Sequence, residues 1–228
     1  GTFDISILRM ERGLLRVLAT GGDSALGGDD FDEMLVDWMC ERWGLSVLTS
    51  VQRRRLTSLA RSVKERLSET DRVAIPGPAE LSGLPDLSFT RKQFHELSAC
   101  LVARSFGACK RAMEGAGGSQ VAHAVLVGGS TRMPVIRDAV AAYFGIEPLC
   151  SINPDEVVAL GAALQADVLV GNGNGEEALL LDVIPLSLGL ETYGGLIEKI
   201  IPRNSVLPLA KAQEFTTAKD GQTGLVIH

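Results

Sequence analysis

The chain has 228 residues, of which 46% are hydrophobic and 22% charged, and its formal net charge is -6. This composition is ordinary for a soluble globular protein, and the length allows one large domain or two modest ones. The acidic balance argues against a nucleic-acid partner, since recognition of a phosphate backbone needs a basic surface. No apolar run reaches the ~18 residues that a membrane span requires, and no signal-like segment opens the chain.

The cysteines indicate a cytosolic protein. The chain has four of them, widely spaced and without a Cys-x-x-Cys pair: Cys40, Cys100, Cys109 and Cys150. This pattern favours reduced, mostly buried thiols over a disulfide framework or a metal site.

The first segment predicts two strands, at residues 3–8 and 14–20, joined by a turn. Two glycine pairs, Gly21-Gly22 and Gly27-Gly28, bracket the loop that follows. A helix is expected to begin at one of the two aspartates after that loop, because carboxylates suit a helix N-terminus.

The next segment predicts a second amphipathic helix over about residues 51–67, then short strands at residues 72–75 and 87–89. Thr90 and Gln93 match a capping box, which predicts a long helix from there to about residue 114.

The third segment predicts a strand at residues 123–127, a turn at Gly128-Gly129 and a helix at residues 134–144. Another helix is expected over residues 157–170. Residues 171–177 are rich in glycine and polar, and they form the clearest boundary in the chain. After residue 182 the pattern changes to short alternating runs that predict an all-β unit, with an Asp-Gly hairpin signal before the last run. These runs cover residues 186–191, 196–201, 213–217 and 224–227.

Three groups of residues have side chains or turns suited to a nucleotide. The glycine turn before Ser130 lets the backbone pass close to a flat ligand, and the helix start after it offers free N–H groups. Thr2 and Asp4 place a hydroxyl and a carboxylate beside a glycine, as a phosphate with its magnesium requires. Lys64 and Ser68 lie on successive turns of one helix. Each group alone also fits a plainer role, as strand–helix packing, solvent-facing strand residues or a charged helix surface.

Taken jointly, these segments resemble one family, the seventy-kilodalton heat-shock (DnaK-like) chaperones, over essentially the whole chain. The matching motifs are Gly1-Thr2-Phe3-Asp4, residues 127–134, residues 151–156, residues 179–192 and Phe215-Thr216-Thr217-Ala218. The amino-acid sequences of three segments are most similar to the HscA branch, which is specialised for iron–sulfur cluster assembly. These segments are residues 182–192, 196–204 and 219–223.

The resemblance implies an α/β fold: the second lobe of an actin-like ATPase, followed by the start of an all-β peptide-binding sandwich. The lobe would cover residues 1–170, with its upper subdomain at about 29–115. An interdomain linker would follow at 171–182, and an incomplete substrate-binding domain at 183–228. Both ends of the chain fall within predicted strands, so we expect an internal piece of a longer protein.

The resemblance also implies sites. Residues expected to bind ATP or ADP are Gly1, Thr2, Lys64, Ser68, Gly128, Gly129, Ser130, Arg132 and Asp155. Asp4 would hold Mg²⁺ through a water molecule. Arg61 stands where an acidic residue is common in the family, and Glu65 at a variable position, so neither is assigned to the site.

The expected peptide-binding residues are Leu190, Thr192, Tyr193, Phe215, Ala218, Gln222, Leu225 and Ile227. Tyr193 and Ala218 would form an arch over the client, although the HscA branch often has a bulkier residue at the position of Ala218. Leu190, Phe215 and Ile227 fit a plain sandwich core as well.

The family implies an ATP-dependent chaperone with a J-domain co-chaperone and, as client, an iron–sulfur scaffold protein or an unfolded peptide. The catalytic groups are expected in the first lobe, so none is assigned here. Alternatives are a general chaperone of the same family, a non-hydrolysing docking fragment, or another user of the lobe such as an actin-like filament protein or sugar kinase. We also expect a bacterial, cytoplasmic protein.

Overall fold

The computed structural model describes residues 1–78, 83–118, 120–150, 152–171 and 179–228. These divide into two compact units. The first comprises Gly1–Phe3, Asp23–Gly107 and Gln120–Asn172, and the second Asp4–Gly22, Ala108–Ser119 and Gly173–His228. The predicted linker at 171–182 falls largely on residues 172–178, outside the described residues, as does Ser151 of the predicted 151–156 motif. Within the described residues, no helix is both long and apolar enough to cross a membrane.

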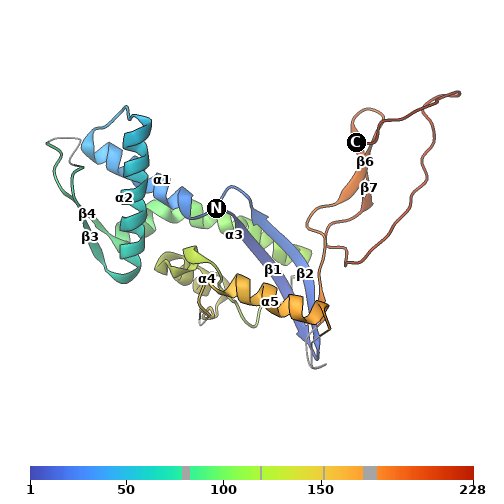
Figure 1. Ribbon diagram of the computed structural model, residues 1–228, viewed down its shortest axis with the longest axis horizontal. Coiled ribbons are helices and arrows are strands. Elements are labelled where there is room, and N and C mark those ends of the chain that lie inside the picture. Colours follow the sequence, from blue (N-terminus) through green and yellow to red (C-terminus); the bar gives the residue numbers. More distant parts are fainter. Residues whose placement is uncertain (79–82, 119, 151, 172–178) are drawn as a thin grey trace. The chain divides into compact units, whose positions relative to one another are not determined.

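The first unit is built around two helices and a β-hairpin (Figure 1). Helix α1 (Gly28–Trp43) packs against α2 (Ser50–Glu69), and strands β3 (Arg72–Ile75) and β4 (Leu87–Thr90) pair antiparallel beside them. These elements confirm the predicted helices and strands of this segment. Its largest fully buried apolar side chains are Leu35, Val36, Met39, Leu56, Val63, Leu67, Val73, Ile75 and Phe89.

The long helix α3 (Arg91–Gly115) begins at the predicted capping box. The backbone N–H of Gln93 donates to Thr90 Oγ1 at 3.2 Å, and the N–H of Thr90 donates to Gln93 Oε1 at 2.9 Å. Because two otherwise unpaired helix-end donors are satisfied reciprocally, the start of α3 is fixed by local sequence. Thr49 and Gln52 form the same arrangement at the start of α2.

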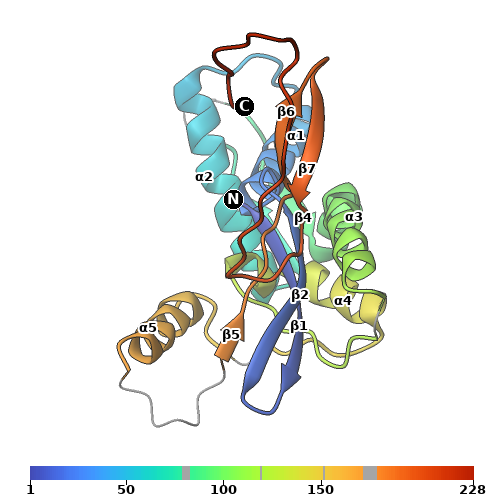
Figure 2. The ribbon, with the colours of Figure 1, turned by 90° about the vertical axis from the view of Figure 1, so that its right-hand side faces the viewer.

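The second unit contains a three-stranded sheet in the order β1-β2-β5 (Figure 2). Strand β1 (Phe3–Glu11) neighbours β2 (Leu14–Asp23), and β5 (Leu179–Leu181) runs parallel to β2 with Leu14 opposite Leu179. The prediction that Gly21-Gly22 begin a loop is wrong, because β2 continues through them. A Cβ on Gly21 would lie 3.5 Å from Ala112 Cβ, which is an ordinary contact distance, so α3 packs directly beside the strand at this point.

The prediction of a strand at residues 123–127 is also wrong. This segment forms one parallel bridge, Val125 with Leu149, and Val125 and Val127 are 58% and 46% exposed. The glycine turn that follows contains the 3₁₀ helix η1 (Gly129–Arg132), and α4 (Pro134–Phe144) begins where predicted. Helix α5 (Val157–Leu169) matches its prediction to within one residue.

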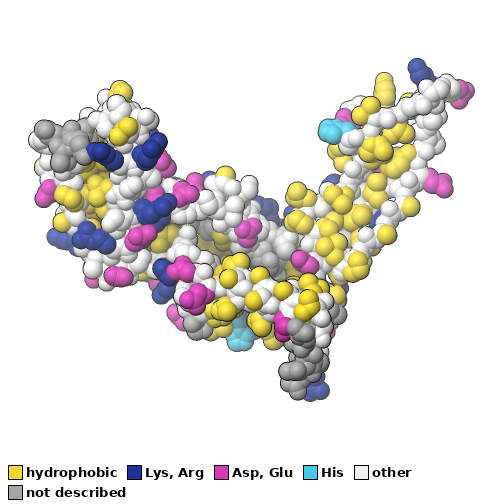
Figure 3. Space-filling view, in the orientation of Figure 1, with side chains coloured by type: hydrophobic (Ala, Val, Ile, Leu, Met, Phe, Trp, Pro, Cys, Tyr) yellow, Lys and Arg dark blue, Asp and Glu magenta, His cyan; other side chains and the backbone are white. Residues whose placement is uncertain are grey.

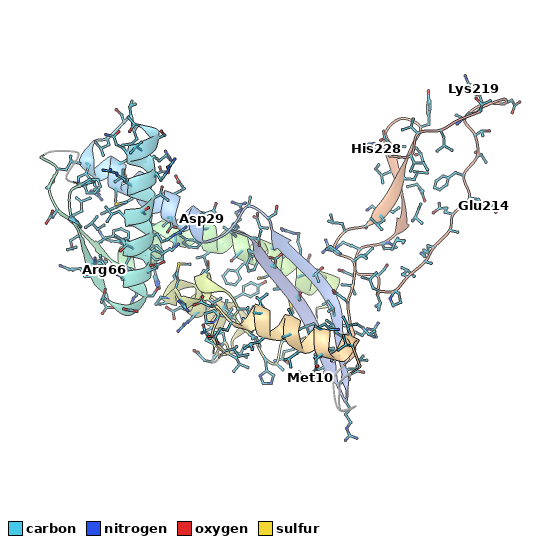
Figure 4. The ribbon with its side chains drawn as sticks, in the orientation of Figure 1. Met10, Asp29, Arg66, Glu214, Lys219 and His228 are labelled. Carbon is cyan, nitrogen blue, oxygen red and sulfur yellow. The ribbon has the colours of Figure 1, made fainter. Side chains whose placement is uncertain are left out.

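The C-terminal segment forms one antiparallel hairpin, β6 (Leu188–Thr192) with β7 (Leu196–Ile201). The strands predicted at residues 213–217 and 224–227 do not form, and Asp220-Gly221 makes a turn without a hairpin. Figure 4 labels Glu214 and Lys219 on this irregular stretch, which leads away from β7. Its apolar side chains are exposed, so no strand partner buries them. The predicted β-sandwich therefore remains a hypothesis.

Candidate functional site

The start of α1 is a backbone surface made of glycines. Gly27 caps the helix: its N–H donates to Asp30 Oδ2 at 2.7 Å, and its carbonyl accepts from the N–H of Asp30. A Cβ on Gly27 would lie 2.5 Å from the Cα of Gly1, so the two glycine backbones touch and Gly27 has no room for a side chain, while a Cβ on Gly1 would be tightly placed, 3.1 Å from the Cα of Gly27. This places the predicted phosphate residue Gly1 beside free N–H groups of a helix N-terminus, a favourable position for an anion.

Lys64 approaches the same place from α2. Its Nζ donates to the carbonyl of Gly28 at 2.9 Å and forms an ion pair of 2.7 Å with Asp32 Oδ1. A Cβ on Gly28 would lie 3.2 Å from Lys64 Nζ and 3.5 Å from Ser130 Oγ. Gly28, Lys64 and Ser130 therefore converge, although the three positions are far apart in sequence.

Ser68 lies one turn further along α2 and lines a small hollow together with Lys64. The other wall of that hollow includes Met133 and Pro134, at the start of α4. The structure thus brings both predicted α2 residues to the side of α2 that faces the start of α4.

The glycine turn has a conformation that requires its first glycine. Gly128 has φ +92°, a region that side chains rarely adopt, and its carbonyl accepts from Thr131 Oγ1 at 2.6 Å. Gly129 begins η1, and no atom would meet a Cβ there, so its backbone borders open space. Arg132 Nη2 forms an ion pair of 2.6 Å with Asp155 Oδ2, which joins two predicted site residues.

The first turn of α1 and the facing side of α2 carry a network of charges. Arg61 pairs with Asp29 at 3.0 Å and with Asp32 at 3.3 Å. The pKa of Arg61 is raised, chiefly by its hydrogen bond to Asp32. Figure 3 shows basic and acidic side chains interspersed over this part of the first unit, which fits a solvated mixed-charge surface.

The contacts of this cluster do not test two further predicted site residues. Thr2 is exposed, and Asp4 is exposed and belongs to the second unit. Their roles at phosphate and magnesium stay predictions. Sequence reasoning missed Gly27, Gly28 and Asp32; the signal was present as a glycine pair directly before an acidic helix start.

The structure brings only some of the predicted peptide-binding residues together. Leu190 and Thr192 are half-buried on β6, and Tyr193 is exposed at the turn that follows. Gln222 accepts a hydrogen bond from the N–H of Ala218 at 3.0 Å, so these two meet across a turn. The structure does not bring Phe215, Leu225 and Ile227 into a sheet, and all three are exposed. The peptide site therefore stays a prediction.

Comparison with known proteins identifies the family. The sequence profile of the Hsp70 protein family matches residues 1–228. The chain belongs to the Hsp70 family. The similar curated proteins include the chaperone protein HscA homolog of Actinobacillus pleuropneumoniae, 54% identical over 230 residues. Chaperone protein HscA of Cronobacter sakazakii and the HscA homolog of Aeromonas hydrophila are each 56% identical over 231 residues.

These relatives are matched over 100% of this chain but over 36–37% of their own length. This Hsp70 chain thus spans just over a third of the curated proteins that it matches. The resemblance to the heat-shock family and to its HscA branch is confirmed, and the filament-protein and sugar-kinase alternatives are set aside.

Proposed function

We propose that the protein carrying this chain is an ATP-dependent chaperone and that the chain forms the adenosine side of its nucleotide site. The convergence of Gly28, Lys64 and Ser130 supports this role most strongly. Three features suit a nucleoside di- or triphosphate: a glycine backbone without room for side chains, one ammonium group and one hydroxyl. Gly128, Gly129, Arg132 and Ser68 would border the adenosine, and Asp155 would hold Arg132 in place.

The residues fit ATP or ADP with Mg²⁺ in their chemistry. Gly1 and Thr2 would contact the phosphates, and Asp4 would bind the magnesium through water. The bound magnesium would neutralise phosphate charge. Catalytic groups belong to the first lobe, which we place outside this chain.

We further propose that nucleotide binding is coupled to the binding of a client peptide. Strand β5 supports this, since residues predicted to lie in the linker pair with β2 of the lobe sheet. A linker bound at a sheet edge can respond to the lobe and act on the domain that follows. Leu190, Thr192 and Tyr193 on the β6–β7 hairpin would begin that peptide-binding domain.

Because the relatives are named HscA, we propose that the client is an iron–sulfur scaffold protein and that the work is cluster assembly or transfer in the cytoplasm, with a J-domain co-chaperone. A general folding chaperone of the same family is the alternative. ATPase assays of the full-length protein distinguish the two roles. Stimulation by a scaffold peptide but not by unrelated unfolded peptides supports the specialised role, and equal stimulation by both kinds of peptide contradicts it.

The nucleotide role is tested by ADP titration of the full-length protein with Lys64→Met. We expect the dissociation constant to rise about tenfold or more, as for loss of a charged hydrogen bond to a ligand. Lys92→Met is the matched control, because Lys92 is an exposed lysine that pairs only weakly with Glu96, at 3.9 Å. Equal affinity of Lys64→Met and wild type would contradict the proposed site.

A further inference from the structure

Asp32 is a carboxylate buried in the wall of the proposed nucleotide site. It lies on α1 and is 0% exposed. Burying an ionised carboxylate is costly unless it is paired and hydrogen-bonded. Both of its oxygens meet cations from α2: Oδ1 lies 2.7 Å from Lys64 Nζ, and Oδ2 lies 3.3 Å from Arg61 Nε.

The two cations have different exposure. Arg61 is more than half exposed and also pairs with Asp29, whereas the Lys64 side chain is 12% exposed. They lie three residues apart, hence on one face of α2. Because a lysine stem has four rotatable bonds, its ammonium takes one position only where something fixes it. Asp32 is the charged group that fixes Lys64.

The position so fixed is the one the nucleotide would need. Nζ forms an ion pair with Asp32 and donates one hydrogen bond, to the Gly28 carbonyl, and an ammonium has three N–H groups, so it can donate to a ligand oxygen as well. Ser130 Oγ lies on the same side of Gly28. A ligand oxygen placed between Lys64 and Ser130 would complete the coordination of that ammonium.

We propose that Asp32 is a positioning residue for the nucleotide: it holds the Lys64 ammonium beside Gly28 and Ser130, where it donates to an oxygen of a nucleoside diphosphate. This inference rests on the proposed function, and it assigns to Asp32 an effect that is exerted through Lys64.

The test compares ADP binding by the full-length protein and its Asp32→Asn variant. Asparagine keeps the size of the side chain and removes its charge, so Lys64 loses its anchor. We expect the dissociation constant for ADP to rise about tenfold, the size typical of coupled neighbours. Glu33→Gln is the matched control: Glu33 is also a carboxylate of α1 that pairs with an arginine of α2, Arg53, but it is partly exposed and away from Lys64. The affinity of the Glu33→Gln variant for ADP should stay within about twofold of that of the wild-type protein.

A double-mutant cycle separates positioning from a general loss of structure. If Asp32 acts through Lys64, adding Asp32→Asn to Lys64→Met weakens ADP binding no further. Additive losses would overturn the proposal. Should Asp32→Asn fail to fold, Asp32→Glu serves instead, because its extra methylene displaces the ammonium; unchanged ADP affinity in a folded Asp32→Glu variant would also overturn it.

A second readout needs no nucleotide. Acetylation of Lys64, followed by peptide mass spectrometry, should be faster in Asp32→Asn than in wild type, while acetylation of Lys92 stays the same. Equal Lys64 rates would contradict the anchoring. Failure of wild type itself to bind ADP would overturn the proposed function and this inference together, whereas normal ADP binding by Asp32→Asn would overturn this inference alone.

Discussion

Two cysteines on α3 differ sharply in environment. Cys109 is buried, and this burial raises the pKa of its thiol to about 11; Cys100 is exposed. Since the thiolate is the reactive form, we expect iodoacetamide at mildly alkaline pH to label Cys100 readily and to spare Cys109. Peptide mass spectrometry after timed quenching measures both rates. In urea the two should react alike; preferential labelling of Cys109 in the folded protein would contradict its burial.

The same thiol makes stability depend on pH. The unfolded thiol ionises near its ordinary pKa of about 8.5, below the folded value. Below about pH 8.5 the thiol is neutral in both states and the folded state keeps its full stability. As the pH rises from there towards 11, the thiol ionises in the unfolded state only, so the free energy of unfolding falls. Cys109→Ala should remove this part of the alkaline decline.

The residues of the first unit that are predicted to bind a nucleotide show how much can be inferred from single residues of the sequence. Lys64, Ser68 and Ser130 were identified from sequence, and the structure brings Lys64 and Ser130 to one glycine, although their binding role is untested. Asp32 and Gly28 were not identified from the sequence, because their importance arises from burial and from contact with another helix. Neither property is visible in a local pattern. Arg61 was excluded from the site, and its contacts with Asp29 and Asp32 give it a structural role.

At the level of elements, the capping box of α3 is a local interaction with a measurable cost. We expect Thr90→Ala to lower the free energy of unfolding by about 1 kcal/mol, because the N–H of Gln93 loses its acceptor. Urea denaturation followed by circular dichroism measures this change. Ser58→Ala is the control, since Ser58 is an exposed residue inside α2 whose hydroxyl only bonds back to Arg54. No difference between the two variants would show that the cap contributes nothing.

Helices were predicted better than strands, for a physical reason. A helix is specified by its own caps and apolar face, and α2, α3 and α4 each began within one residue of the predicted start. A strand needs a partner that its own sequence does not specify. Residues 213–217 and 224–227 alternate correctly yet form no strand, whereas residues 72–75 and 87–89 pair with each other. The short three-residue pairing of β5 with β2 likewise could not be inferred from its leucines alone.

At the level of the whole molecule, the chain matches its relatives over 36–37% of their length. Phosphoryl transfer depends on positioning and on charge stabilisation around the whole phosphate chain. The described residues supply a glycine backbone, one ammonium and one hydroxyl at a single place, and Arg132, just after the glycine turn, forms an ion pair with Asp155. Under the proposed function this set would bind a nucleotide, and it includes no group that we assign to activation of the attacking water.

We therefore expect the 228-residue chain by itself to bind ADP weakly and not to hydrolyse ATP. A phosphate-release assay under single-turnover conditions measures hydrolysis, and equilibrium titration with a fluorescent ADP analogue measures binding. Lys64→Met should abolish the weak binding and leave phosphate release at the buffer rate, as in wild type. Lys92→Met controls for loss of positive charge. Turnover by the chain at a rate comparable to the full-length protein would place catalytic groups within these residues and contradict our proposal that they lie outside this chain.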